Sequence, residues 1–158
     1  MKTYFSRFAM ALAAAFLLIP GVTQAQRREA RGRLYTKADV DRIIKRVEDR
    51  SDKFEKEFDK ALDRSRLNNT RREDQLNDYA EDLEKATDEL RREFDRRDAW
   101  ADNKAEVRKC LDIATKLNLA MRNRRLGTKV ESTWSALRYE LNTLEDVYNM
   151  PAVGSSQY

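Results

Sequence analysis

Pairs of neighbouring carboxylates are the residues of this chain with the most evident chemical potential. Glu48-Asp49, Glu73-Asp74, Glu81-Asp82 and Asp88-Glu89 could supply calcium ligands or the two carboxyl groups of a glycosidase. A calcium loop, however, needs oxygen ligands at alternating positions around a glycine turn, and a catalytic acid pair needs burial. Because these carboxylates alternate with Lys and Arg, the sequence predicts a solvated surface rather than a site.

Residues for nucleophilic or metal chemistry are scarce. The sequence has no histidine and a single cysteine, which argues against Ser-His-Asp and Cys-His catalysis and against the usual zinc sites. Its four glycines are isolated, so there is no glycine-rich phosphate loop. We therefore expect no enzyme activity, no metal site and no bound cofactor.

Two hydroxyl residues, Ser51 and Thr87, occupy positions that the helical pattern described below assigns to the core. The simpler interpretation is a slim layer in which each hydroxyl bonds to the preceding helical turn. The alternative is a polar site that holds a small molecule between helices. A pocket around these two residues would favour that alternative.

Trp100 and Cys110 are the other single residues of interest. Trp100 lies near a predicted helix connection, where it either caps one end of the fold or contacts a partner. Cys110 borders the apolar face that Val107 and Leu111 define, so we expect a small buried hydrophobe rather than a thiol that pairs two chains.

Residues 1–25 have the three-part pattern of a secretory signal peptide. Lys2 and Arg7 form a basic start, residues 8–19 are apolar, and small residues follow. The apolar run is about 12 residues long, whereas a membrane-spanning helix needs about 20. We expect cleavage after Ala25 and a mature protein without a transmembrane span, located in the periplasm or outside a bacterium.

A basic segment follows the predicted signal peptide. Its five cations are Arg27, Arg28, Arg31, Arg33 and Lys37, and Glu29 is its only acid. The rest of the mature chain is slightly acidic, so the positive charge is concentrated here. We expect residues 26–35 to form a flexible arm, either a disordered leader or a segment that binds a polyanion such as a phosphate-rich envelope surface or an acidic protein. Nucleic-acid binding is not expected.

An internal repeat predicts the folded part of the chain. Apolar residues with heptad spacing run from Val40 to Ala61, and the same pattern returns 36 residues later from Leu76 to Phe94. One continuous coiled coil would repeat at a multiple of seven, so the offset indicates two helices with a break at residues 67–70. The core positions are Val40, Ile44, Val47, Phe54, Phe58, Ala61, Leu76, Ala80, Leu83, Leu90 and Phe94.

Capping patterns mark the helix boundaries. Thr36 and Thr70 begin capping boxes that open the first two helices, the first reaching about residue 67. A third helix is expected over residues 104–125 after a cap at Asn103, with Gly127 as its left-handed stop. A capping box at Thr128 opens the fourth helix, which Pro151 ends.

The short connections favour an all-α fold, an antiparallel up-down-up-down four-helix bundle over residues 36–150 with a long hairpin of its first two helices. Residues 151–158 are expected to form a frayed C-terminal tail.

The segment Trp134–Leu144, WSALRYELNTL, resembles the closing helix of small exported bacterial helical proteins that have no assigned activity. The resemblance implies an exported bacterial protein and assigns no functional residue. We expect a non-enzymatic structural or partner-binding component of the bacterial envelope, chaperone-like if the hairpin projects. Its partner would be another protein, a second copy of itself, or an anionic envelope surface reached by the arm. The alternative is an envelope sensor or a bundle that binds a small ligand.

Overall fold

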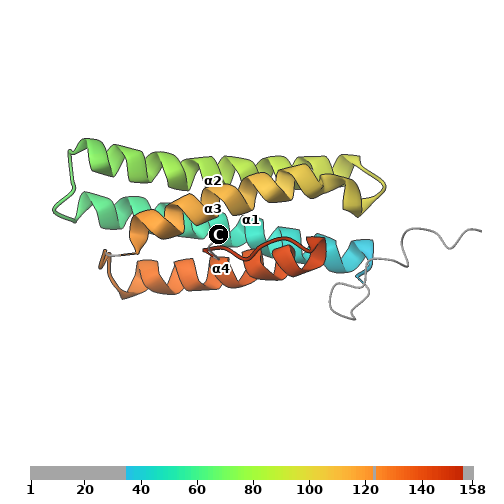
Figure 1. The fold of residues 1–158 in the computed structure, drawn as a ribbon. Coiled ribbons are helices and arrows are strands. Elements are labelled where there is room, and N and C mark those ends of the chain that lie inside the picture. The colour runs from blue at the N-terminus through green and yellow to red at the C-terminus, as the bar shows by residue number, and fades with distance from the viewer. Residues whose placement is uncertain (1–34, 123, 155–158) are drawn as a thin grey trace, which may run out of the picture.

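The computed structural model describes residues 35–122 and 124–154, which form an all-α fold without strands (Figure 1). The 3-10 helix η2 lies between the second and third of four longer helices. These elements are α1 (Lys37–Asp63), α2 (Arg71–Arg96), η2 (Trp100–Asn103), α3 (Lys104–Met121) and α4 (Thr128–Tyr148). The predicted signal peptide and arm, residues 1–34, lie outside the described residues.

The four helices pack side by side around one apolar core. α1 contacts both α2 and α4, and α2 contacts α3; of these neighbouring pairs and α3–α4, the α3–α4 pair is in contact least. Every predicted heptad position except Ala61 is buried; at that end of α1, Leu62 fills the core and Ala61 is half-buried. Burial of one such Leu or Phe side chain stabilises a fold by roughly 1.5–3 kcal/mol, so the two stripes account for much of the stability.

The predicted cap of α1 is confirmed. The Thr36 side chain accepts a hydrogen bond from the Asp39 amide at 3.1 Å, and the Asp39 carboxylate accepts one from the Thr36 amide at 3.0 Å. The cap of α2 differs in one detail: Thr70 accepts from the Glu73 amide, but the Glu73 carboxylate accepts from the amide of Asn69. Asn69 can present its amide in this way because it adopts a left-handed conformation with φ 59°.

Several predicted boundaries are wrong. α1 ends at Asp63 and α3 at Met121, each four residues earlier than expected. Thr128 is the first residue of α4 rather than its cap, and Gly127 (φ 98°, ψ 154°) begins α4 instead of stopping α3. The Asn103 side chain makes no capping bond either, since it donates to the carbonyl of Trp100.

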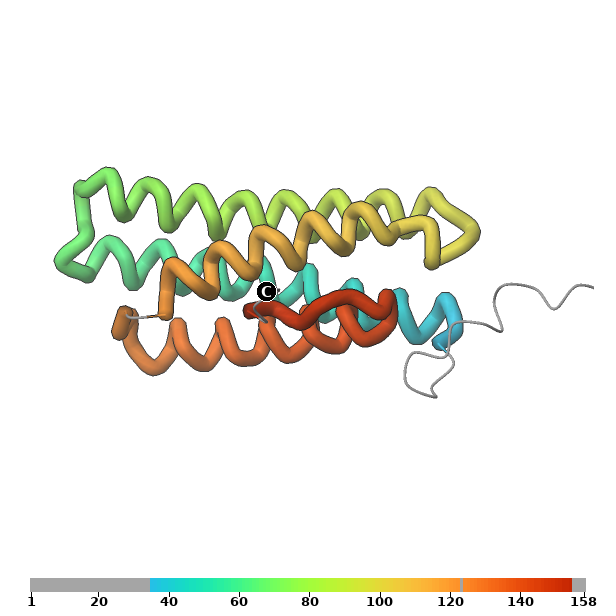
Figure 2. The backbone as a smooth tube through the Cα atoms, in the orientation of Figure 1, coloured from blue at the N-terminus to red at the C-terminus, as the bar shows by residue number. Residues whose placement is uncertain are grey.

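The end of α4 also differs from the expectation. The helix stops at Tyr148, before Pro151, because Asn149 turns into the left-handed region with φ 52°. The chain then runs back along α4 beside α3 (Figure 2). Met150 and Val153 are buried there against the core.

Hydrogen bonds from both neighbouring helices hold this C-terminal segment. The Val153 amide donates to the Asn142 side chain at 3.1 Å, and the Gly154 amide donates to the Thr115 hydroxyl at 3.4 Å. A Cβ atom at Gly154 would lie 2.6 Å from the side-chain nitrogen of Asn118. The prediction of a frayed tail is therefore wrong for residues 151–154, while residues 155–158 lie outside the described residues.

Candidate functional site

The structure places one member of the predicted basic arm. Lys37 is the first residue of α1, and its ammonium group donates to the Arg97 carbonyl at 2.7 Å. The same group lies 5.5 Å from the centre of the Phe94 ring. Lys37 thus ties α1 to the end of α2. The other four cations of the arm, Arg27, Arg28, Arg31 and Arg33, lie outside the described residues.

Trp100 is half-buried at the turn between α2 and α3. Its ring makes an edge-to-face contact with Tyr148 of α4, with ring centres 5.4 Å apart. The Tyr148 hydroxyl donates to the Trp100 carbonyl at 2.6 Å. Trp100 therefore takes part in closing this end of the fold. Because part of its side chain is accessible, Trp100 is still a candidate partner contact.

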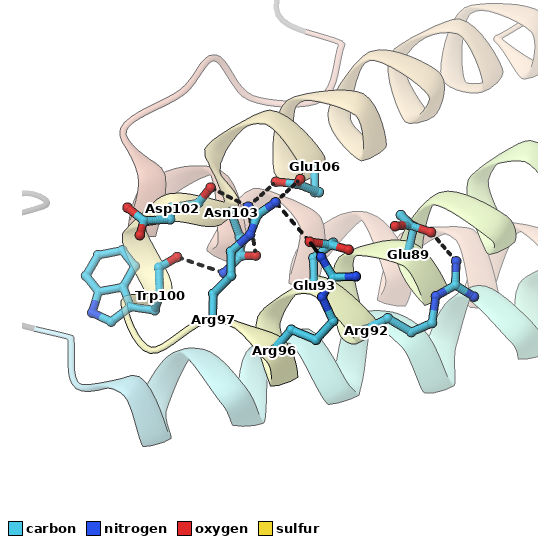
Figure 3. Close-up of polar contacts among 9 residues, drawn as sticks. All are labelled: Glu89, Arg92, Glu93, Arg96, Arg97, Trp100, Asp102, Asn103 and Glu106. Atoms are coloured by element: carbon cyan, nitrogen blue, oxygen red, sulfur yellow. Dashed lines mark hydrogen bonds and ion pairs between the residues drawn. The ribbon is translucent and has the colours of Figure 1, made fainter.

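Arg97 organises the same end of the fold, a role that the sequence did not reveal (Figure 3). Its guanidinium group lies 2.9 Å from carboxylate oxygens of both Glu93 and Glu106. It also donates to the Asp102 carbonyl at 2.6 Å. The two carboxylates, Glu106 above all, raise the pKa of Arg97. Because the acceptors belong to α2, η2 and α3, one side chain fixes the path of the chain around the corner.

A second clamp joins α1 to α4. Glu140 is 2 % exposed, and its two carboxylate oxygens accept from Arg46 at 2.9 Å and from Arg50 at 3.2 Å. Arg46 and Arg50 stand one turn apart on α1, so both reach the same carboxylate. The sequence pattern shows the two arginines but not their acceptor, which lies about 90 residues further along the chain.

Carboxylates gather along the seam between α1 and α2. Oxygen atoms of Asp52, Glu84 and Asp88 lie within 4.8 Å of one another, and all three residues are half-buried. Burial, and then the charge of Asp88, raises the pKa of both Glu48 and Glu84. This group has the oxygen ligands that hard divalent cations prefer. Groups of acidic side chains near a protein surface are also common without a metal, so we assign no metal to this one.

The two core hydroxyls are buried. Ser51 and Thr87 are each 1 % exposed, and neither lines the open pockets at residues 108–152, 57–130 or 41–95. Thr87 donates to the Glu84 carbonyl at 2.8 Å, one turn back, as predicted. The Ser51 hydroxyl is buried without a hydrogen-bond partner.

Cys110 is buried, as predicted. Its thiol is fully shielded and donates to the Ala86 carbonyl of α2 at 3.3 Å. Burial raises the pKa of this thiol to about 12. Cys110 therefore acts as a small core residue between α3 and α2.

The chain matches no protein-family model, no curated protein and no solved structure among those with which it was compared. Within residues 35–154, apart from position 123, no helix combines the length and the apolar character that crossing a bilayer requires.

Proposed function

We propose that this protein is an exported, non-enzymatic helical bundle that works by contact, as a structural or partner-binding component of the bacterial envelope. The observation that supports this proposal is the filled interior. Phe54, Phe58 and Phe94 are fully buried together with the leucines of all four helices, so a partner would bind at the surface. The buried carboxylate of Glu140 joins α1 to α4, and that of Glu93 holds Arg97, which also binds Glu106 of α3.

We also propose the antiparallel up-down-up-down arrangement for the four helices. Asp41 near the start of α1 pairs with Arg91 near the end of α2, which supports an antiparallel hairpin. Glu57 near the end of α1 pairs with Lys129 at the start of α4, which supports an antiparallel α1–α4 pair. The hairpin turn extends beyond the α3–α4 connection in Figure 1, as a chaperone-like role would require.

Zero-length carbodiimide cross-linking tests this topology. We expect a Glu57–Lys129 cross-link in the mass spectrum of the digested monomer, with the local pair Glu81–Lys85 as an internal positive control. Recovery of the local link without any link between α1 and α4 would contradict the antiparallel arrangement.

Fractionation tests export. The full chain expressed in a bacterium should appear in the periplasm or medium with Gln26 as its first residue, and its mass should correspond to residues 26–158. Retention of the intact chain in the cytoplasm would refute this part of the proposal.

Photo-cross-linking tests the contact function in the cell. Leu119 of α3 and Tyr139 of α4 are exposed large apolar residues, at 58 % and 69 % exposure, and Trp100 is the candidate partner contact. We expect a benzoylphenylalanine residue at one of these positions to give a discrete adduct. The buried position Phe58 serves as the control that should give none. The absence of adducts from every surface position would argue against a contact function.

A further inference from the structure

One end of the fold concentrates positive charge. The α1–α2 connection (residues 64–70) and the described residues of the α3–α4 connection (122 and 124–127) lie at the same end of the molecule (Figure 1). Together they contain five arginines and no Asp or Glu, namely Arg64, Arg66, Arg122, Arg124 and Arg125, and Lys129 follows in the first turn of α4. This end differs in sign from the carboxylate-rich seam further along α1 and α2.

An open pocket of about 350 Å³ lies between these two connections. Lys60, Arg64, Arg125 and Lys129 line it, and Glu57 is the single carboxylate among them. Glu57 pairs with Lys129 at 2.8 Å and with Lys60 at 3.8 Å. Within the described part of the chain, the guanidinium groups of Arg64 and Arg125 form no ion pair. The pocket therefore contains two arginine forks whose donors are available to a ligand.

Backbone groups at the start of α4 add to this positive character. Gly127 and Val130 line the pocket, and no side chain caps the helix at Gly127. A Cβ atom at Gly127 would meet nothing within 4 Å, so the space over the first turn is open. The amide groups of a first helical turn have no partner within the helix and attract anions.

We propose that this pocket is a binding site for a phosphate group. A guanidinium fork matches two phosphate oxygens, and two such forks beside two ammonium groups can neutralise a dianion. Glu57 is the only acid that competes for these cations within the pocket. The phosphate is either a soluble ion or part of a lipid headgroup, and the proposal is independent of export and uses no residue of the basic arm.

Binding of pyrophosphate by calorimetry, and flotation with vesicles of phosphatidylglycerol or of phosphatidylcholine alone, test the proposal on a full-length chain in which Arg27, Arg28, Arg31 and Arg33 are replaced by Gln, so that the arm does not contribute to binding. The variant Arg64→Gln/Arg125→Gln should lose at least tenfold in affinity. The control Lys104→Gln/Lys109→Gln removes the same charge from exposed positions of α3 outside the pocket and should change affinity less than twofold. Glu57→Gln frees Lys60 and Lys129 and should raise affinity several-fold.

The outcomes separate the two sources of phosphate. Pyrophosphate binding identifies a soluble ligand, and binding only to phosphatidylglycerol vesicles identifies a lipid headgroup; either result supports the site if the pocket variant abolishes it. Circular dichroism with thermal unfolding verifies that each variant is folded. Equal losses in the pocket and control variants would show general charge attraction and overturn the proposal, as would no binding of either probe at low salt.

Discussion

Burial makes the thiol of Cys110 unreactive in the native protein. Its pKa of about 12 leaves almost no thiolate at pH 8, and the surrounding helices exclude reagents. We expect a thiol-reactive dye to label Cys110 in the native chain at a rate limited by local or global unfolding. In denaturant, the dye should label Cys110 immediately. A time course of absorbance measures both rates. Rapid native labelling, or a dimer that reductant dissolves, would contradict the burial of Cys110.

Glu140 should contribute far more to stability than an exposed carboxylate. Glu140→Ala leaves Arg46 and Arg50 without their shared acceptor, although both arginines can still reach water, so we expect a loss of about 1–3 kcal/mol in the free energy of unfolding. Urea denaturation measures it. Glu81→Ala, which removes the exposed pair with Lys85, is the control and should cost no more than about 0.5 kcal/mol. Equal effects would mean that the clamp is not stabilising.

At the residue scale, prediction from sequence depends on where the partner of a side chain lies. The burial of Cys110 follows from its neighbours Val107 and Leu111 on the same helix face, so the sequence was sufficient. The roles of Arg97 and Glu140 depend on partners in other elements, and the spacing rules of a single helix carry no information about them. The pocket at the basic end was missed for the same reason, because it combines two connections more than 50 residues apart.

Among the helices, the cap of α1 should make stability depend on pH. Hydrogen bonds from Thr36, and then from Arg42, lower the pKa of Asp39 to about 2, below the value of about 3.9 in an unfolded chain. The lowered pKa stabilises the folded state above pH 4, and this contribution is lost as the pH falls from 4 through the folded pKa of about 2. Asp39→Asn should therefore lower the melting temperature clearly at pH 7 and much less at pH 2. An equal difference at both pH values would contradict this.

The seam between α1 and α2 should have the opposite dependence. Glu48 and Glu84 have raised pKa values, from burial first and from Asp88 next, so the folded state holds their protons more tightly than the unfolded state does. Protonated Glu48 and Glu84 therefore stabilise the folded state below about pH 4.5. This contribution to the free energy of unfolding is lost as the pH rises through their folded pKa values. Asp88→Asn should stabilise the protein by a few tenths of a kcal/mol at pH 7 and have no such effect at pH 4.

Chemical denaturation at the two pH values tests the prediction for the seam. Asp49→Asn, which removes a charge from an exposed position of α1, serves as the matched control and should show a smaller gain at pH 7. A destabilising effect of Asp88→Asn at pH 7 would contradict the prediction, because it would mean that favourable contacts of Asp88 outweigh its repulsion by Glu48 and Glu84.

The helices themselves followed from the sequence because heptad spacing reports burial directly. Leu76, Leu83 and Leu90 recur on one face, and only a helix brings them together. The ends were less predictable, since competing local signals decide them. Thr128 has the pattern of a cap, but Gly127 provides the extended conformation with positive φ that starts α4, and Thr128 becomes the first helical residue.

For the molecule as a whole, the C-terminal segment completes the packing where α3 and α4 contact each other least. Val153→Ala should cost about 1–2 kcal/mol, because it removes buried methyl groups and leaves a small cavity. Ala152→Ser, one residue away and half-exposed, is the control and should change stability by less than about 0.5 kcal/mol. Thermal unfolding measures both. A Val153→Ala variant as stable as the parent would show that the segment is not part of the core.

The position of residues 150–154 after all four helices affects the order in which the core can form. Met150 and Val153, which pack against the core, follow all four helices in the sequence, so the α1–α2 hairpin can form before this part of the core is complete. Until residues 150–154 dock, the apolar faces that Met150 and Val153 cover stay open to water. Completion of the core therefore depends on the docking of a segment that lies outside the four helices, and a chain in which residues 150–154 have not yet docked exposes apolar surface.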